Sequence, residues 1–158
     1  MPPAAHHLYP DGVTDELHVV PGDQLTAADV YGIWKIRDVV FAVEQQVDEP
    51  DVDDLDLLAT TTHLWFADEH GPTSYVRFLT HEDPWRLGRV CTRKEHRGLG
   101  LSGRLIEECH DRWGHRPIKI GAQSYLEQWY ARYGYVTCGE HYDDAGIDHV
   151  PMLRAADA

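Results

Sequence analysis

Cysteine, positive charge and long apolar runs are all scarce in this chain, and each shortage excludes a class of protein. Three cysteines, Cys91, Cys109 and Cys138, lie far apart in 158 residues. An odd, widely spaced set does not build a disulfide framework, so we expect a protein of the reducing cytoplasm. No apolar run reaches the roughly 18 residues that a membrane-spanning helix needs, so we expect no membrane partner.

Basic residues are outnumbered by acidic ones. Fourteen lysines and arginines stand against 27 aspartates and glutamates, and the formal net charge is −13. Nucleic-acid binding depends on neutralising phosphates with a basic surface, so this balance argues against a nucleic acid partner. The acidity has two readings that stay open at this point: solubility, or attraction of a cationic substrate.

The first fifteen residues differ in composition from the rest. Residues 1–15 carry prolines and histidines and no apolar core, so we expect a flexible extension without a secretory signal. The pair His6-His7 has no third ligand nearby, and we therefore expect no metal site. The whole chain is 42% hydrophobic. This content fits a single domain over residues 16–158.

Hydrophobic periodicity predicts the element order β-α-β-β-β-α-β-α-β-β, a mixed α+β class. Thr26 or Asp29 can cap the first helix, whose apolar stripe contains Val30, Ile33, Trp34, Ile36, Val40 and Phe41. The strands are predicted at residues 16–20, 62–68, 74–79, 88–92, 118–122, 135–142 and 149–154. The later helices are predicted at residues 101–113 and 124–133.

One charged pair lies in or near the apolar stripe of the first helix. Arg37 falls within the stripe, and Glu44 follows on the same face if the helix continues. Buried charges need partners, so an Arg37–Glu44 contact is one reading. In the other, Arg37 extends to solvent and Glu44 ends the helix. The acidic residues 48–56 that follow lack the glycine and closing glutamate of a calcium loop. They form either a solvated loop or the border of a site for a cationic acceptor.

A glycine-rich segment from Arg97 to Gly103 follows the strand Val90-Cys91-Thr92 and opens a helix. Free backbone N–H groups at a helix N-terminus predict a site for a phosphate or pyrophosphate. A P-loop is excluded because Arg104 stands where lysine is required. The spacing Gly-x-Gly-x-x-Gly also matches the dinucleotide fingerprint. That reading is weak because the next strand ends in Ala122-Gln123 without an acidic residue.

Two separated motifs together resemble one family, the GCN5-related N-acetyltransferases, in its ElaA-like branch. The first motif is Arg97-x-x-Gly100-x-Ser102 after the strand at residues 88–92. The second runs from Gln123 through Trp129-Tyr130 to Gly134-Tyr135. The segments of the ElaA-like branch are Val43-Glu44-Gln45, Thr62-His63, Gly121-Ala122-Gln123 and Gly146-Ile147 with His149. The resemblance covers about residues 16–154.

The resemblance implies a fold, a cosubstrate and a set of binding residues. The fold is a central mixed, mostly antiparallel sheet of six to seven strands flanked by about four helices. The cosubstrate is acetyl-coenzyme A, without a metal. The residues implied to bind it are Val90, Cys91, Thr92, Arg97, Gly98, Leu99, Gly100, Leu101, Ser102, Gly103, Gln123 and Tyr130.

The implied reaction is direct attack of an amine on the thioester. A backbone N–H near Cys91 or Thr92, where the strand is expected to diverge from its neighbour, stabilises the thioester oxygen. Tyr130 is the implied general acid. A phenol near pKa ~10 protonates a thiolate near ~8.5 at a cost of only about 2 kcal/mol. Cys91 also permits an acyl-enzyme, although a small apolar strand residue explains it equally well.

The base and the acceptor are less defined. Glu44 is the first choice of base, with His63, Glu140, His149 and solvent water as alternatives. The predicted acceptor-binding residues are Arg37, Glu44, His63 and His149. The acceptor is a small-molecule or peptidyl amine, weakly favoured as cationic. The sequence does not decide between a monomer and a homodimer. An acyl-coenzyme A sensor without catalysis is the second function, and a dinucleotide oxidoreductase is a distant third.

Overall fold

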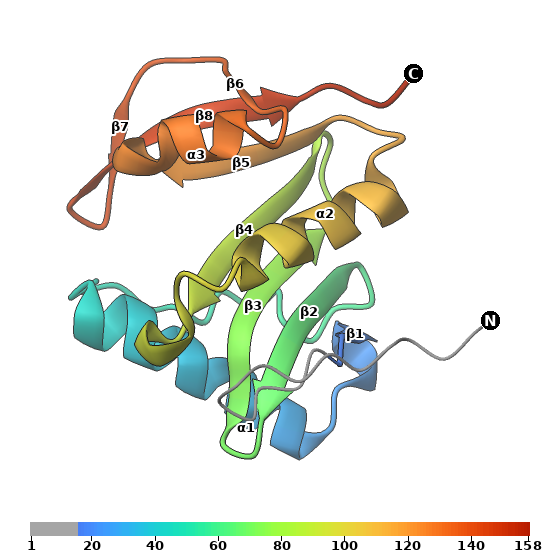
Figure 1. Ribbon diagram of the computed structural model, residues 1–158, viewed down its shortest axis with the longest axis vertical. Helices are drawn as coiled ribbons and strands as arrows, with labels where there is room; N and C mark the ends of the chain where they lie inside the picture. Colours follow the sequence, from blue (N-terminus) through green and yellow to red (C-terminus); the bar gives the residue numbers. More distant parts are fainter. Residues whose placement is uncertain (1–15) are drawn as a thin grey trace.

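Alternate residues of strand β2 (Thr61–Asp68) face opposite sides of a sheet, and both sides are buried. Leu64 and Phe66 pack in one apolar cluster, and Trp65 between them packs in another. A strand with two buried faces lies inside a sheet that is covered on both sides. The computed structural model that shows this arrangement describes residues 16–158 (Figure 1).

The strands form one mostly antiparallel sheet in the order β1-β2-β3-β4-β5-β8-β6, with β7 also paired to β8. The other strands are β1 (His18–Pro21), β3 (Gly71–Leu79), β4 (Trp85–Thr92), β5 (Ile118–Gln123), β6 (Val136–Thr137), β7 (Tyr142–Asp144) and β8 (Ile147–Arg154). The expected α+β class is confirmed, with eight strands in the sheet. Among the described strands only β4 and β5 pair in parallel, which excludes the doubly wound dinucleotide fold.

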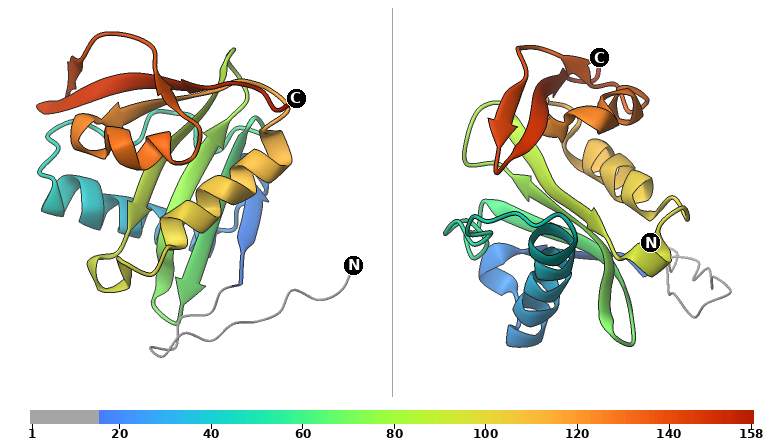
Figure 2. Two further views of the ribbon diagram at one scale, coloured as in Figure 1. Left: turned by 45° about the horizontal axis from the view of Figure 1, so that its top comes forward. Right: turned by 90° about the vertical axis from the view of Figure 1, so that its left-hand side faces the viewer.

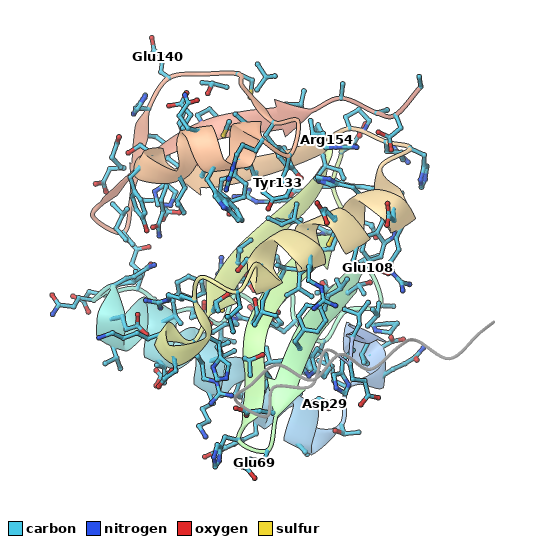
Figure 3. The ribbon with its side chains drawn as sticks, viewed as in Figure 1. Asp29, Glu69, Glu108, Tyr133, Glu140 and Arg154 are labelled. Carbon is cyan, nitrogen blue, oxygen red and sulfur yellow. The ribbon has the colours of Figure 1, made fainter. Side chains whose placement is uncertain are left out.

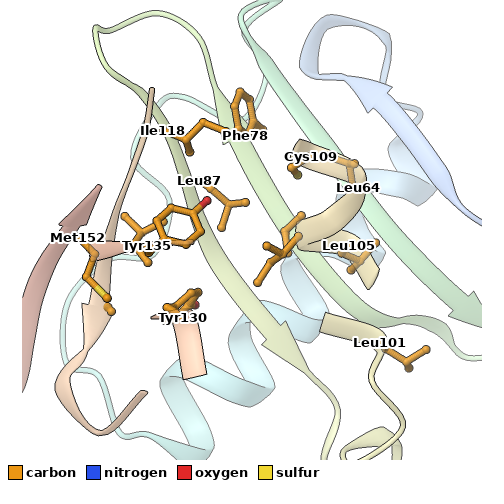
Figure 4. Packing of buried hydrophobic residues seen from close by; sticks show 14 of the residues in the cluster. Leu64, Phe78, Leu87, Leu101, Leu105, Cys109, Ile118, Tyr130, Tyr135 and Met152 are labelled. Carbon is orange, nitrogen blue, oxygen red and sulfur yellow. The ribbon is translucent and has the colours of Figure 1, made fainter. Parts of the chain in front are cut away.

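Helix α2 (Leu101–Trp113) covers one face, at the bounds that its stripe predicts. Trp113 stacks on Phe78 of β3 with ring centroids 4.3 Å apart. Figure 4 shows the surrounding core, which includes Leu64, Leu87, Leu101, Leu105, Cys109, Ile118, Tyr130, Tyr135 and Met152. The short helix α3 (Glu127–Ala131) joins the same core through Tyr130.

Helix α1 (Ala27–Arg37) lies on the opposite face, and the two helices flank the central strands in Figure 2. A capping box begins the helix: the Asp29 backbone N–H donates to the Thr26 hydroxyl oxygen, and the Thr26 backbone N–H donates to the Asp29 carboxylate. The chain then continues as a π-helical segment, η2 (Asp38–Glu44). Within α1 itself, Trp34 of the predicted stripe is 42% exposed, because Ile33 and Ile36 form the face that is turned to the sheet.

Strands β4 and β5 pair only at their beginnings and then diverge. The pairs are Trp85 with Ile118 and Arg86 with Lys119, after which β4 continues without a partner on that side. A bulge adds to the divergence, since Arg89 has φ 50° and the β3–β4 register shifts there. The predicted divergence near Cys91 and Thr92 is therefore confirmed.

The C-terminal region departs most from the sequence prediction. Residues 135–142 form no single strand; only Val136–Thr137 and Tyr142–Asp144 pair with β8. The turn into β8 uses positive φ angles at Ala145 and Gly146. The predicted N-terminal extension, residues 1–15, lies outside the described residues. Within residues 16–158, no helix has the length and apolarity to cross a membrane.

Candidate active site

The glycine-rich segment leaves the first turn of α2 without a side-chain cap. Gly100, the N-cap residue, adopts a left-handed conformation with φ 76° and has no side chain to bond the following N–H groups. Gly98 also has a positive φ of 80°. The N–H groups of this turn are therefore free to bind an anion, as the sequence predicts.

Hydrogen bonds and close packing hold this segment against the sheet. The Ser102 and Thr92 hydroxyl oxygens lie 2.6 Å apart, and Thr92 also reaches the hydroxyl of Ser74 at 2.8 Å. On the other side, a Cβ at Gly103 would collide with the hydroxyl of Tyr133, which Figure 3 shows beside α2. The glycine-rich segment is therefore packed between β4 and the turn that follows α3.

Arg97 bridges the glycine segment to η2. Its Nη2 donates to Glu44 at 2.6 Å, and its Nε donates to the Thr92 carbonyl at 3.0 Å. Of the two readings of Arg37 and Glu44, the contact between them is wrong. The other is right only in part, because Glu44 ends the helical segment but Arg37 is fully buried. Glu44 has turned with the π-helical segment toward the glycine loop, away from Arg37.

Two cavities meet at the point where β4 and β5 diverge. The first, which we call the loop groove, has a volume of about 660 Å³. It is lined by Val40, Glu44, Gln45, Val90, Cys91, Thr92, His96, Arg97, Gly98, Gly100, Leu101, Ser102, Gly103, Trp129, Arg132 and Tyr133. Most of the residues predicted to bind coenzyme A line this groove. Leu99 does not, and 36% of it is exposed.

The second, which we call the splay cavity, has a volume of about 370 Å³ on the α1 side of the sheet. Gln123, Tyr130 and His149 line it together, as do Gly88 and Arg86 of β4. Both cavities share Gln45 and Val90. A hydrogen bond of 3.0 Å from Gln123 Nε2 to Gln45 Oε1 spans the divergence at this junction.

Tyr130 lies at the wall of the splay cavity with its ring held by edge contacts. The rings of Trp129 and Tyr135 pack against it at 4.9 and 6.0 Å between centroids. Only 7% of the residue is exposed, and this burial raises the pKa of the phenol. Within residues 16–158 its hydroxyl has no hydrogen-bond partner. The phenol is therefore protonated at neutral pH and free to donate its proton.

His149 enters the same cavity from β8, opposite Gln123 of β5. Its Nδ1 lies 2.7 Å from the Ile147 carbonyl oxygen, which can only accept a hydrogen bond. This contact assigns the proton to Nδ1 and leaves Nε2 as an acceptor. The ring stacks on Tyr142 with centroids 5.5 Å apart, so its orientation is fixed from two directions.

Three other residues that were predicted for the site line neither cavity. Arg37 and His63 are fully buried and line neither cavity, so their assignment as acceptor-binding residues is corrected. His63 bonds Tyr75 Oη at 2.6 Å and the Asp56 carbonyl at 2.8 Å, and burial lowers its pKa. Glu140 projects from the outer loop near β6, away from both cavities (Figure 3).

The acidic loop is held by arginines that the sequence analysis did not connect to it. The arginine–aspartate network consists of Arg37, Arg77, Arg89, Asp51, Asp53 and Asp56. Its shortest contact joins Arg37 Nη1 to Asp56 Oδ1 at 2.6 Å, with both side chains buried. A solvated loop therefore does not describe these aspartates. The loop borders the splay cavity through Glu49, Asp51 and Asp53, of which Asp51 and Asp53 are paired with arginines. Their arginine partners could not be predicted from the sequence, because Arg37, Arg77 and Arg89 come from three separate elements, α1, β3 and β4.

Cys91 is unsuited to form an acyl-enzyme. It is 4% exposed within the α1-side core, and burial raises the pKa of its thiol. The nucleophile would be the thiolate, which this burial disfavours. The reading of Cys91 as a small apolar strand residue agrees with these surroundings.

Comparison with known proteins supports the same assignment as the fold and the two cavities. Residues 41–155 match the family model described as an acetyltransferase (GNAT) domain. The chain belongs to this family. It is therefore an enzyme of the acyltransferase class, and the segments Arg97–Ser102 and Gln123–Tyr135 both lie within the matched residues.

Individual relatives cover almost the whole chain. A UPF0039 protein of Mycobacterium tuberculosis is 39% identical over 90% of this chain and 94% of its own length. Protein ElaA of Escherichia coli is 32% identical over 83% of this chain and 90% of its own length. The resemblance to the ElaA-like branch is thereby confirmed.

Solved structures show the same fold. An acyl-CoA N-acyltransferase from Pseudomonas aeruginosa superposes with a TM-score of 0.81 at 33% identity, covering 89% of this chain and 99% of that one. The crystal structure of Escherichia coli ElaA gives a TM-score of 0.78 at 28% identity, with 88% and 98% covered.

Proposed function

We propose that this GNAT enzyme transfers an acetyl group from acetyl-coenzyme A to a primary amine by direct attack on the thioester. One observation carries the proposal: the loop groove and the splay cavity meet at Val90 and Gln45. A donor in the groove and an acceptor in the cavity then have one common point of contact. Holding two reactants at one point removes much of the entropic barrier to their reaction.

The donor lies in the loop groove in this proposal. The uncapped N–H groups after Gly100 bind the pyrophosphate, and the positive end of α2 adds to the attraction. The pantetheine arm follows the part of the unpaired β4 edge that lines this groove, from Val90 to Thr92. In this proposal a backbone N–H of that edge near Val90 stabilises the thioester oxygen as negative charge develops on it.

Tyr130 is the proposed general acid. The amine nitrogen attacks the thioester carbon, a C–N bond forms, and the C–S bond breaks. The leaving thiolate takes the proton of the Tyr130 hydroxyl. Burial raises the pKa of Tyr130. The same dry surroundings also make the thiolate more basic, so the two groups remain matched for proton transfer.

His149 is the proposed base, in place of Glu44. Glu44 lines only the loop groove and is neutralised by Arg97, whereas His149 lines the splay cavity with Nε2 available. The proton that leaves the attacking nitrogen passes to this Nε2. Glu44 then acts on the donor side by orienting Arg97 beside the pyrophosphate loop.

Release of coenzyme A tests the proposal. The purified protein is mixed with acetyl-coenzyme A and a panel of primary amines, and free thiol is followed with a thiol reagent while calorimetry measures donor binding. We expect donor binding and acceptor-dependent release, with an acetylated amine detected by mass spectrometry. Donor binding without release from any amine would favour the sensor, and absence of donor binding would refute both functions.

A further inference from the structure

Arg86 is an unmatched cation on the wall of the splay cavity. It projects from β4 toward Tyr142 of β7, and its Nη2 would lie 3.5 Å from a Cβ at Gly121. In the part of the chain that the structure describes, no carboxylate lies within ion-pair distance of Arg86. A half-buried guanidinium without a partner is a ready site for a carboxylate ligand.

Other positive charges of the cavity wall are already neutralised. Arg77 donates to Asp53 at 2.7 Å, and Arg89 donates to Asp51 at 2.9 Å. These contacts belong to the arginine–aspartate network. They hold the loop in place and leave neither guanidinium unpaired for a ligand. Of the three arginines on this wall, Arg86 is therefore the one without an ion-pair partner among the described residues.

Two carboxylates of the same wall are also unmatched. Glu82 reaches Lys119 at 3.3 Å, but no ion pair within residues 16–158 involves Glu49 or Asp144. The cavity thus offers one free cation and two free anions to a ligand. Its volume of about 370 Å³ suits a small molecule. The complementary ligand carries an ammonium group and a carboxylate at once.

We propose that the acceptor is a small aminocarboxylate whose carboxylate binds Arg86. This rests on the proposed function, of which it specifies the acceptor class. Glu49 and Asp144 attract the ammonium end into the cavity, and the amine loses a proton before it attacks the thioester. The products are coenzyme A and an N-acetylated aminocarboxylate, with the proton of the attacking nitrogen passed to His149.

Matched acceptors and charge variants test the assignment. The panel pairs glycine, β-alanine, 4-aminobutyrate and 6-aminohexanoate with alkylamines and diamines of equal chain length. We expect wild type to favour the aminocarboxylates at least tenfold in kcat/KM. Arg86→Gln removes that preference, and Arg86→Glu reverses it toward diamines. Arg112→Gln, which removes an exposed α2 arginine paired with Glu108, leaves the preference unchanged.

Binding gives a second readout that does not need turnover. The protein saturated with coenzyme A is titrated with each acceptor by calorimetry, and circular dichroism checks that every variant folds. We expect Arg86→Gln to weaken aminocarboxylate binding at least tenfold without changing donor binding. Equal losses for all acceptors, or a wild-type preference for diamines, would overturn the assignment. Acceptor binding that depends on Arg86 without any transfer would refute only the proposed catalysis.

Discussion

At the scale of single residues, Tyr130 combines two properties that a proton donor needs. Its ring is fixed between aromatic neighbours, and its hydroxyl has no competing partner in the described residues. A phenol that already donated a hydrogen bond within the protein would have to break it before it could protonate the thiolate. The unpartnered hydroxyl avoids that cost.

Replacing Tyr130 with Phe removes the proton and keeps the packing of the ring. We expect kcat to fall about 100-fold or more, which is the scale of general acid catalysis, with unchanged affinity for coenzyme A. Steady-state kinetics and calorimetry measure the two effects. Tyr31→Phe, an exposed residue of α1, is the control. Full turnover in Tyr130→Phe would remove the phenol from the mechanism.

Residue roles carried by a motif could be predicted from the sequence, and roles that depend on distant partners could not. Tyr130 and Gln123 were singled out by their motif as coenzyme A-binding residues, and both line the splay cavity rather than the loop groove. For Arg37 the sequence left two readings open, a buried charge with a partner and a side chain that extends to solvent, and the first holds. Its partners, Asp51 and Asp56, lie in an irregular loop, where no periodicity indicates which side chains face the core.

The arginine–aspartate network should make the free energy of unfolding fall at acid pH. Contacts with Arg77 and Arg89 outweigh the effect of burial and lower the pKa of Asp53 to about 2. In the unfolded chain this carboxyl has its ordinary pKa of about 3.9. The stabilisation is therefore complete above about pH 4 and is lost as the pH falls toward 2.

Chemical denaturation across this range measures the dependence. We expect Asp53→Asn to be less stable than wild type at pH 7 and to lose less stability between pH 4 and 2. Asp23→Asn, at an exposed position in the turn after β1, serves as the matched control and follows wild type. If the free energy of unfolding of Asp53→Asn changed with pH as steeply as that of wild type, the Asp53 carboxyl would not be a source of the pH dependence.

At the scale of elements, the clearest agreement between sequence and structure is α2. Its stripe of Leu101, Leu105 and Cys109 predicts both the bounds and the buried face, because regular spacing leaves only one face apolar. The π-helical segment η2 and the bulge at Arg89 were not predicted. Both depart from a regular period, η2 over seven residues and the bulge at Arg89, and each brings a side chain to a cavity wall, Glu44 to the loop groove and Arg89 to the splay cavity.

The N-terminus of α2 offers a test with a neutral matched variant. Position 100 has space for a side chain, and Asp and Asn both tolerate its left-handed conformation. Asp at this position would place its carboxylate on the N–H groups proposed to bind pyrophosphate. We expect Gly100→Asp to bind coenzyme A about tenfold more weakly than Gly100→Asn, a difference of about 1.4 kcal/mol.

Acetyl-pantetheine, which lacks the pyrophosphate, is the control ligand for this pair of variants. Its affinity should be the same in both, since the introduced charge lies only beside the loop. A tenfold loss for acetyl-pantetheine as well would mean that Asp distorts the groove, and it would argue against the loop as the pyrophosphate site.

Gly88 of β4 tests the acceptor side. A side chain there would enter open space in the splay cavity, and its backbone has no left-handed φ that would oppose substitution. We expect Gly88→Leu to raise the acceptor KM at least tenfold and Gly88→Ala to raise it less, both with unchanged donor affinity. Weaker coenzyme A binding in Gly88→Leu, with an unaltered acceptor KM, would place the acceptor elsewhere.

At the scale of the whole molecule, the site exists because one sheet changes from paired to unpaired strands. β4 and β5 are parallel for two residue pairs, and the loop groove and the splay cavity, which we propose to hold donor and acceptor, meet where the strands diverge. The family resemblance implied this mixed, mostly antiparallel sheet, although with six to seven strands where residues 16–158 form eight. The junction of the two cavities at Val90 and Gln45 depends on the twist and bulge of β4, which no local sequence pattern encodes.

A crystal structure with acetyl-coenzyme A bound tests this account most directly. It predicts the pyrophosphate on the N–H groups after Gly100 and the thioester at the junction of Val90 and Gln45, with the Tyr130 hydroxyl within hydrogen-bonding reach of the sulfur. A thioester outside that junction, or a pyrophosphate away from the N-terminus of α2, would contradict the account.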